Sequence, residues 1–585
     1  MNKKSLFLSC LSFLLLPIYS FGQKNTVGFI TPFEQDSTHT ATHTEGSIFY
    51  QKLARHFSSK IKLSTFGSSD GGAPLYAAII SSDKTFTPES ARKAGKLVLF
   101  INNAIHPGEP EGVDATMLFV RDLLTDAKNE AFLKHIVVVV IPFYNIDGAL
   151  NRSATSRANQ NGPADYGFRG NAQNLDLNRD FIKCDTRNAA SFNPFFAAWQ
   201  PDVFIDNHTS NGADYQYIMT CIATQQSKLA PQLGDYQQNA LLPQLYAAMK
   251  TAGFEMTPYV SFDELPDKGI MGFMDSPRYS TGYAALHHAL GFMPEAHMLK
   301  PFPDRVRGTL AFSKAVFKIC FDDKNKILSA KKAAIDFYKT EKKTFELQWK
   351  LDTTQRKILT FKGYTAKRKP SEVSGLPRLW YARSEPYQKT IPYFDFYTPS
   401  VSIQKPTAYI VPQAYAKVIE RLRWNGVAMR SLTADTMVDV EMYRITNFRS
   451  SPNPYEGHHP NSGVEVSVEK KKWTYHKGDF WIELNQNANR YIVETLEPQG
   501  VDSYFAWNFF DGILNQKEGY SDYVFEDVAT DILKKNAALR QKLEEKRKSD
   551  PKFAADAGAQ LDFVYKNSPY FEPTFRLYPI GRVVK

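Results

Sequence analysis

A histidine and a glutamate that follow an apolar segment are the residues of this sequence best suited to metal chemistry. The apolar residues 97–101 lead into the sequence His106-Pro107-Gly108-Glu109. Side chains at this H-x-x-E spacing can point the same way from one turn and share a metal ion. A catalytic zinc takes imidazole nitrogen and carboxylate oxygen from three protein residues and keeps one position open. His208, which follows the apolar residues 203–205, is the candidate for the third ligand.

Apolar strands that alternate with amphipathic helices must position these residues. The sequence predicts strands at 96–101, 135–142, 202–206 and 289–295. It predicts helices at 45–57, 112–124, 235–251 and 306–321, the first of them opened by a capping box at Thr42 and Glu45. This alternation is typical of an α/β fold with a mixed, mostly parallel sheet and helices on both faces.

Three of the polar candidates stand at the carboxyl ends of predicted strands. His106 follows the first of these strands, His208 follows the third, and Glu295 ends the fourth. In open α/β sheets, ligands bind just outside the carboxyl ends of the strands. We therefore expect these three side chains to meet at one edge of the sheet.

Two arginines lie between the candidate ligands, Arg157 in Arg157-Ala158-Asn159 and Arg179 in the sequence 176–181. Guanidinium groups stay charged and bind carboxylates bidentately. Arginines near a zinc ion indicate an anionic substrate or a polarised carbonyl group. A Ser-His-Asp hydrolase is disfavoured, because the sequence has no G-x-S-x-G nucleophile elbow.

Taken in order, these motifs resemble those of the zinc carboxypeptidase family typified by carboxypeptidases A and B. They are H-P-G-E (106–109), N-x-D-G (145–148), R-x-N (157–159), D-L-N-R-D-F (176–181), D-N-H-T (206–209) and a late glutamate, Glu295. The resemblance covers residues 40–320, about half of the chain. The occurrence of all these motifs in this order is specific evidence for the resemblance, although each motif alone is weak evidence.

The resemblance implies a zinc centre and a proton shuttle. His106, Glu109 and His208 would hold one zinc ion. Glu295 would be the general base that activates the zinc-bound water and then the acid that protonates the leaving amine. The family usually has T-x-E-L around its glutamate, whereas Glu295 lies in M-P-E-A-H and matches by its place at a strand end. His297 is the alternative to His208 as third ligand.

The resemblance also implies how a peptide would bind. Arg157 would polarise the scissile carbonyl group and stabilise the oxyanion. Asn178 and Arg179 would grip the free C-terminal carboxylate of the substrate. Members of the family close a mobile tyrosine over the substrate, and Tyr283 is the candidate for it, with Tyr279 as the alternative.

The N-terminus indicates export. Lys3 and Lys4 precede the apolar residues 6–18, and small residues at 20 and 22 favour cleavage before Gln23. Residues 1–22 are thus predicted to be a signal peptide, and the protein is expected in the periplasm or outside the cell. Loss of two lysines lowers the formal net charge from +10 to +8. No later segment is apolar for long enough to span a membrane, and no motif indicates nucleic-acid binding.

The rest of the chain is less informative. A length of 585 residues indicates two domains, which we place at 23–325 and 346–585 with a lysine-rich helical linker at 326–345. The second is expected to be an α+β domain, with a strand and helix at 410–425, strands at 473–484 and 490–496, and a charged helix at 531–548. The cysteines after the signal peptide, Cys184, Cys221 and Cys320, allow at most one internal disulfide.

The sequence thus favours an exported zinc metallocarboxypeptidase that acts on peptides with a free C-terminal carboxylate. One alternative is a zinc amidase or deacylase on small acylated amino acids, since related hydrolases share H-x-x-E and a distant histidine. Another is a catalytically silent module that binds peptides or glycans. The complete ligand set argues against the silent module, and Asn178, Arg179 and the large second domain favour a peptide substrate.

Overall fold

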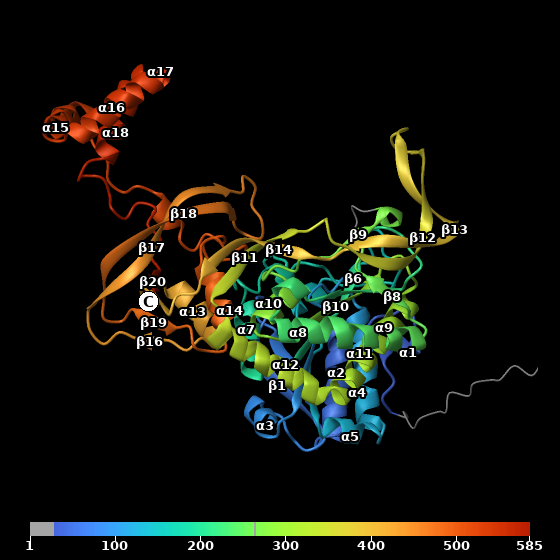
Figure 1. Cartoon of the computed structure of the whole chain (residues 1–585). Helices are drawn as coiled ribbons and strands as arrows, with labels where there is room; N and C mark the ends of the chain where they lie inside the picture. The colour runs from blue at the N-terminus through green and yellow to red at the C-terminus, as the bar shows by residue number, and fades with distance from the viewer. Residues whose placement is uncertain (1–27, 262–264, 585) are drawn as a thin grey trace, which may run out of the picture.

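The computed structural model describes residues 28–261 and 265–584 (Figure 1). The predicted signal peptide, residues 1–22, lies outside the described residues. Within the described part of the chain, none of the helices has the length and apolar character needed to cross a bilayer.

The N-terminal domain is built on a mixed, mostly parallel sheet, as predicted. The sheet runs in the order β1 (Ile61–Ser68), β2 (Pro74–Ile80), β4 (Ile136–Ile141), β3 (Leu97–Asn102), β5 (Val203–Asp206), β10 (Leu290–His297), β7 (Met219–Ala223) and β8 (Met256–Pro258), and β6 (His208–Ser210) pairs with the end of β10. The central strands β4, β3, β5 and β10 are parallel. Every residue of β3 and β4 is buried, which explains their continuous apolar sequences.

Helices cover both faces of this sheet. The helices concerned are α2 (His43–His56), α4 (Glu111–Thr125), α7 (Arg187–Trp199), α10 (Ser280–Leu286) and α11 (Phe302–Asp322). Phe100 and Phe204 are register neighbours, and both rings contact Phe196 of α7. Phe292 pairs one position further along and therefore points to the other face, where it contacts Phe312 of α11. Helix α11 packs in turn on α4.

The predicted linker is a structural part of the N-terminal domain. Residues 326–345 include most of α12 (Lys324–Asp336) and the short helix η5 (Phe337–Glu341). Ile327 is buried, and the ammonium group of Lys331 donates to the carbonyl oxygens of Gln200 and Pro201, each at 2.6 Å. The segment is docked on helices α8 (Pro231–Tyr236) and α11 of the domain that precedes it.

A long hairpin follows and also belongs with the first domain. It is formed by β12 (Lys357–Pro370) and β13 (Pro377–Phe394), and β13 pairs with β9 (Ile270–Met271) of the N-terminal domain. It is drawn in yellow in Figure 1, above the N-terminal domain and away from the orange C-terminal sheet. The strands β11 (Thr344–Leu351) and β14 (Tyr397–Gln404) pair between these two bodies.

The remaining residues form the expected α+β domain. Its sheet runs in the order β16 (Arg430–Ser431), β19 (Phe480–Glu483), β15 (Ala408–Val411), β20 (Gly581–Val583), β17 (Thr436–Ser450) and β18 (Asn461–Tyr475). Helix α13 (Ala416–Trp424) follows β15, which confirms the predicted strand and helix at 410–425. The predicted strand at 490–496 is wrong, because these residues form helix α14 (Asn489–Leu496).

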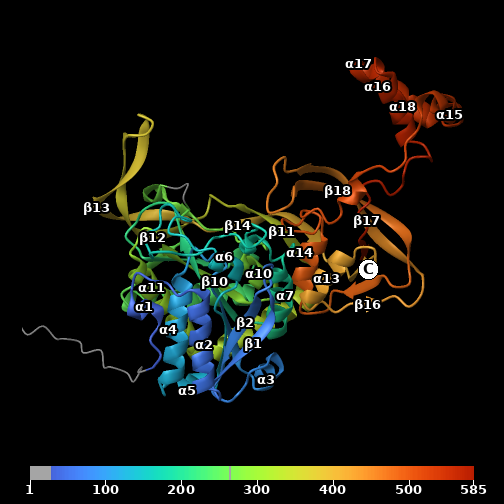
Figure 2. The same ribbon diagram turned by 180° about the vertical axis from the view of Figure 1, so that it is seen from behind.

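A group of helices interrupts this sheet in the sequence and has its own small core. It consists of α15 (Asp522–Lys535), α16 (Ala537–Ser549), α17 (Pro551–Ala554) and α18 (Ala557–Lys566). Phe525, Leu543 and Val564 belong to that core. The predicted helix at 531–548 is broken at Asn536, whose side chain caps α16. Both views show the group projecting from the C-terminal sheet (Figures 1 and 2).

Candidate active site

The carboxyl ends of three neighbouring strands bring the predicted polar residues together. His106 lies in the loop after β3, and His208 begins β6 directly after β5. Glu295 of β10 stands opposite His208 in the parallel register of β6 and β10. Topology alone therefore places the distant segments of the sequence at one edge of the sheet.

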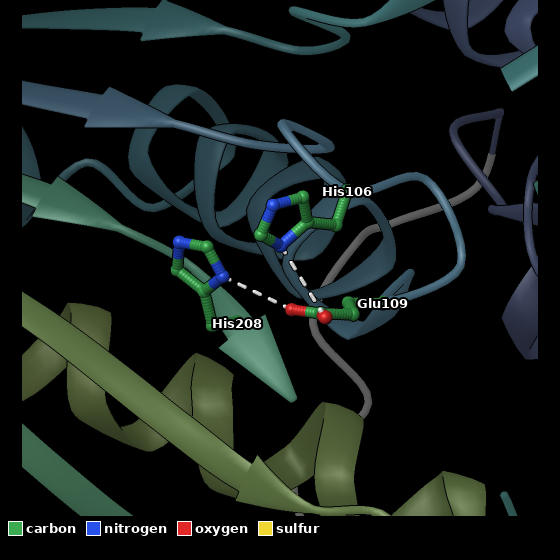
Figure 3. Close-up of side chains that lie close together, drawn as sticks. All are labelled: His106, Glu109 and His208. Atoms are coloured by element: carbon green, nitrogen blue, oxygen red, sulfur yellow. Dashed lines mark hydrogen bonds and ion pairs between the residues drawn. The ribbon is translucent and has the colours of Figure 1, made fainter. Parts of the chain in front are cut away.

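His106, Glu109 and His208 face one another in a buried cluster (Figure 3). The Nδ1 atom of His106 lies 3.3 Å from Oε1 of Glu109, and Nδ1 of His208 lies 3.0 Å from Oε2 of the same carboxylate. One nitrogen or oxygen from each residue falls within 4.8 Å of the others. The arrangement offers two imidazoles and one carboxylate to a common point.

A second carboxylate stands behind each imidazole. Nε2 of His106 lies 2.8 Å from Oδ1 of Asp176, and Nε2 of His208 lies 2.9 Å from Oδ2 of Asp206. Such carboxylates orient the ring and leave its other nitrogen as a metal ligand. Nδ1 of His106 is buried and, apart from its approach to Glu109, has no hydrogen-bond partner among the described residues, so its lone pair fits a cation. Two histidines and one glutamate are the donor set of a catalytic zinc site.

The surroundings shift the pKa values of the two glutamates of this site in opposite directions. Burial would raise the pKa of Glu109, but the charges of Arg157 and His106 hold it well below its usual range. Burial raises the pKa of Glu295 to about 8, because its charged form loses contact with water. A bound cation would lower this pKa again. Glu109 is therefore suited to bind a cation, and Glu295 to exchange a proton near neutral pH.

The H-P-G-E turn is tightly packed at its glycine, where there is little room for a larger side chain. A Cβ atom on Gly108 would lie 3.0 Å from Cδ of Arg157 and 3.1 Å from the carbonyl oxygen of Gly167. Arg157 forms an ion pair with Glu109 and donates to the carbonyl oxygen of Thr209 at 3.0 Å. Its guanidinium group therefore lies beside the candidate metal ligands.

A cleft of about 490 Å³ joins the cluster to the other predicted residues. Its lining includes His106, Glu109, Arg157, Asn178, Arg179, His208, Tyr279 and Glu295. Asn178 and Arg179 belong to the short helix η1 (Leu177–Arg179). The Asn178 side-chain oxygen accepts the backbone N–H of Ser280 at 3.0 Å, so its NH₂ group remains as a donor for a ligand. The ring of Tyr279 covers the Arg179 guanidinium. The distance from Cζ of Arg179 to the centroid of the Tyr279 ring is 4.5 Å.

The part of the sequence that contains these residues is similar to a known protein family. Residues 47–252, which include all three candidate ligands, match the model of the zinc carboxypeptidase family. This stretch is similar to the zinc carboxypeptidases. The similarity supports a metallocarboxypeptidase-class hydrolase.

Curated relatives and solved structures are also similar to parts of this chain. Carboxypeptidase 2 of Trichophyton rubrum is 21% identical over 471 residues, which is 76% of this chain and 79% of the relative. Carboxypeptidase 2 of Trichophyton equinum is 21% identical over 78% of this chain and 82% of the relative. The carboxypeptidase A structure from Helicoverpa armigera has a TM-score of 0.37 and 16% identity, over 51% of this chain and 75% of that one.

The structure corrects one residue of the predicted site. Tyr283 is fully buried inside the carboxypeptidase domain, where its hydroxyl donates to Asn425 at 2.6 Å and its ring stacks on Phe181. Helix α10 turns this side chain into the core. Tyr279 has extended backbone angles just before α10, and its ring lines the cleft instead. Tyr279, the alternative in the sequence, is thus the tyrosine that faces the site.

His297 is not an alternative ligand in the carboxypeptidase domain. Its Nε2 lies 2.8 Å from the carbonyl oxygen of Ala213, and its Nδ1 accepts the backbone N–H of Leu299. Both ring nitrogens are therefore used away from the cluster. His297 is one strand step beyond Ala296 and two beyond Glu295, so it shares the Glu295 face but lies further along β10.

Several residues of the cleft had no predicted role. Arg169 donates to Asp176 at 2.9 Å and lies 3.3 Å from Glu109. The side chain of Asn145 holds it by donating to its carbonyl oxygen at 3.0 Å, which gives the N-x-D-G motif a supporting role. An apolar wall completes the cleft with Ile222, Tyr259, Phe273 and Met293. In the sequence, the only signs of these contacts were the motifs that contain Asn145, Asp176 and Asp206.

Proposed function

We propose that this protein is an exported zinc carboxypeptidase that hydrolyses the C-terminal peptide bond of peptides. One observation carries the proposal: a single cleft holds a complete zinc donor set, a buried glutamate and two side chains suited to a terminal carboxylate. An endopeptidase would not need the last of these features. The predicted signal peptide in residues 1–22 supports export.

His106, Glu109 and His208 would hold the zinc ion. When bound, zinc supplies a Lewis acid and lowers the pKa of a water molecule. The buried carboxylates Asp176 and Asp206 keep both imidazoles oriented, so the site is organised before any ligand arrives.

The chain's own residues would then carry the proton and the developing charge. Glu295 lies in the cleft beside His208, where it can take a proton from the attacking water and deliver it to the leaving amine. Arg157 can donate to the scissile carbonyl oxygen as negative charge develops there. Its contacts to Glu109 and Thr209 fix the guanidinium before the reaction.

Recognition of the terminal carboxylate gives the first prediction. A charge-assisted contact with Arg179 contributes on the order of 1.5–3 kcal/mol, which corresponds to roughly tenfold to a hundredfold in kcat/KM. Amidation of the C-terminus of a peptide should therefore cost wild type at least this factor. Arg179→Ala should lose most of the discrimination between the free acid and the amide. Steady-state kinetics on matched acid and amide peptides measure both effects.

Arg157→Ala is the matched control for this experiment. It should slow cleavage of the acid and the amide alike, because Arg157 serves the carbonyl group and not the terminus. If wild type cleaves amidated and free peptides equally well, the carboxypeptidase proposal fails. An endopeptidase or an amidase would then be the better reading of the cleft.

The two tyrosines give a second prediction with opposite outcomes. We propose that the Tyr279 hydroxyl reaches the substrate, so Tyr279→Phe should lower kcat/KM by roughly twofold to tenfold without changing the melting temperature. Tyr283→Phe should instead remove a buried hydrogen bond to Asn425, at about 1 kcal/mol of stability, with kcat/KM preserved. Thermal unfolding and peptide kinetics of both variants decide, and reversed outcomes would restore Tyr283 to the site.

A further inference from the structure

A loop of the C-terminal domain contacts the segment that carries cleft residues Asn178 and Arg179. It joins β17 to β18 and contacts the turn that carries Asp176 and Arg179. The hydroxyl oxygen of Tyr455 accepts a hydrogen bond from Nε of Arg179 at 3.0 Å. The carboxylate of Glu456 accepts the backbone N–H of Asp176 at 2.8 Å. Both contacts hold residues of the carboxypeptidase domain that face the substrate or orient a candidate zinc ligand.

Local contacts hold the loop at this point. Tyr455 and His458 exchange backbone hydrogen bonds of 2.7 and 3.1 Å. The ring of Tyr455 stacks on Trp507, with centroids 6.2 Å apart and planes 18° apart. Tyr455 therefore presents its hydroxyl from a fixed position.

A second contact between the domains holds the residue next to Tyr279, whose ring covers the Arg179 guanidinium. Arg278 forms an ion pair with the buried carboxylate of Asp502 at 2.7 Å and lies over the ring of Trp507 at 4.9 Å. Arg278 is adjacent in sequence to Tyr279, whose ring covers Arg179. The C-terminal domain thus anchors the backbone that carries Tyr279 as well as the Nε atom of Arg179.

These contacts determine which donors of Arg179 remain for a ligand. A guanidinium has five N–H groups. Nε is used by Tyr455, and one N–H of Nη1 is used by the carbonyl oxygen of Asn178 at 2.9 Å. Nη1 also lies 3.7 Å from Oδ2 of Asp176, whereas Nη2 makes no hydrogen bond within the described residues and stays available for a ligand. A guanidinium that is fixed before binding loses less side-chain entropy when it meets a carboxylate.

We infer that the C-terminal domain completes the binding site for the terminal carboxylate of the substrate, with Tyr455 as the positioning residue of Arg179. The inference rests on the proposed function and deepens it. It gives the C-terminal domain a role in substrate binding, although the three candidate zinc ligands all lie in the N-terminal domain. Tyr455 does not touch the substrate but acts through Arg179.

The test is Tyr455→Phe in the full-length protein. This change removes the acceptor for Nε of Arg179 and keeps the ring that stacks on Trp507. KM for a peptide with a free C-terminus should rise about threefold to tenfold, while kcat stays within about twofold. Values for the amidated peptide and the zinc content should stay at the wild-type level. In an Arg179→Ala background, Tyr455→Phe should have no further effect, because the two residues act as one unit.

Tyr415→Phe provides the matched control. Tyr415 is a half-buried tyrosine of the same domain whose ring packs on Phe510, 4.8 Å away, outside the cleft. This variant should match wild type on both peptides. An unchanged KM in Tyr455→Phe, an equal rise for acid and amide, or additive effects with Arg179→Ala would each overturn the inference. A wild-type protein that does not distinguish acid from amide would overturn the proposed function first.

Discussion

Replacement of Glu295 by glutamine is expected to lower kcat by about 10²- to 10⁴-fold and to leave one zinc ion bound per chain. Glutamine has nearly the same shape but cannot accept and return a proton. Glu295 is buried in the cleft, opposite His208 in the sheet register, and is not part of the ligand cluster. Peptide kinetics and metal analysis on the same preparation measure the two quantities.

Glu346→Gln is a suitable control for that variant. Glu346 pairs with Lys342 at 2.7 Å in the region that joins the two domains, and it does not line the cleft. The Glu346→Gln variant should have the kcat and the zinc content of the wild-type protein. Near-normal turnover of Glu295→Gln would refute its role as proton shuttle. Loss of zinc together with activity would show that Glu295 is itself a ligand.

The second large effect concerns the metal. Wild-type protein should keep one zinc ion per chain after exhaustive dialysis. The double variant His106→Ala, His208→Ala should keep none and should show no measurable peptide cleavage. Without the cation, the buried carboxylate of Glu109 loses the partner for which the cluster is arranged. A strong chelator should abolish wild-type activity, added zinc should restore it, and the chelated protein should melt at a lower temperature.

His476→Ala controls for the loss of a histidine. His476 is largely exposed, lies 3.2 Å from Asp435 in the C-terminal domain and is remote from the cluster. This variant should retain zinc and activity. Unchanged zinc in the double variant, or a wild-type protein without zinc, would rule out the site formed by His106, Glu109 and His208.

The sequence predicts the N-terminal domain well for a physical reason. Strands buried on both faces, such as Ile136–Ile141, must be continuously apolar, and polar residues at their carboxyl ends meet at one edge whatever their separation in the chain. The convergence of His106, His208 and Glu295 could therefore be derived from strand ends and motif order. The second carboxylates Asp176 and Asp206 were visible only as parts of those motifs.

The C-terminal domain shows where local patterns become ambiguous. Residues 490–496 are rich in β-branched and aromatic side chains, which indicates a strand. In the structure they form α14, and Tyr491, Ile492 and Leu496 are buried against the core. A short apolar segment fits the periodicity of a helix and that of a strand. The elements that pack against it therefore decide which structure it adopts.

One error and one omission at the site have a similar origin. The choice between Tyr279 and Tyr283 depends on the residue at which α10 begins, and helix ends are hard to place from sequence. The contact between Tyr455 and Arg179 joins residues 276 positions apart, and no motif marks it. Such contacts exist only once both domains are folded.

The position of β20 has a consequence for the order in which the protein folds. This strand, Gly581–Val583, lies between β15 and β17 and pairs with both, so it joins the two halves of the C-terminal sheet. The sheet cannot close until residues 581–583 have been synthesised, whereas the N-terminal sheet, as far as the structure describes the chain, uses no strand beyond β10. Non-local strand pairing of this kind is slow to form. During synthesis the metal donors can therefore assemble first, and the support that Tyr455 gives to Arg179 is among the last contacts to be made.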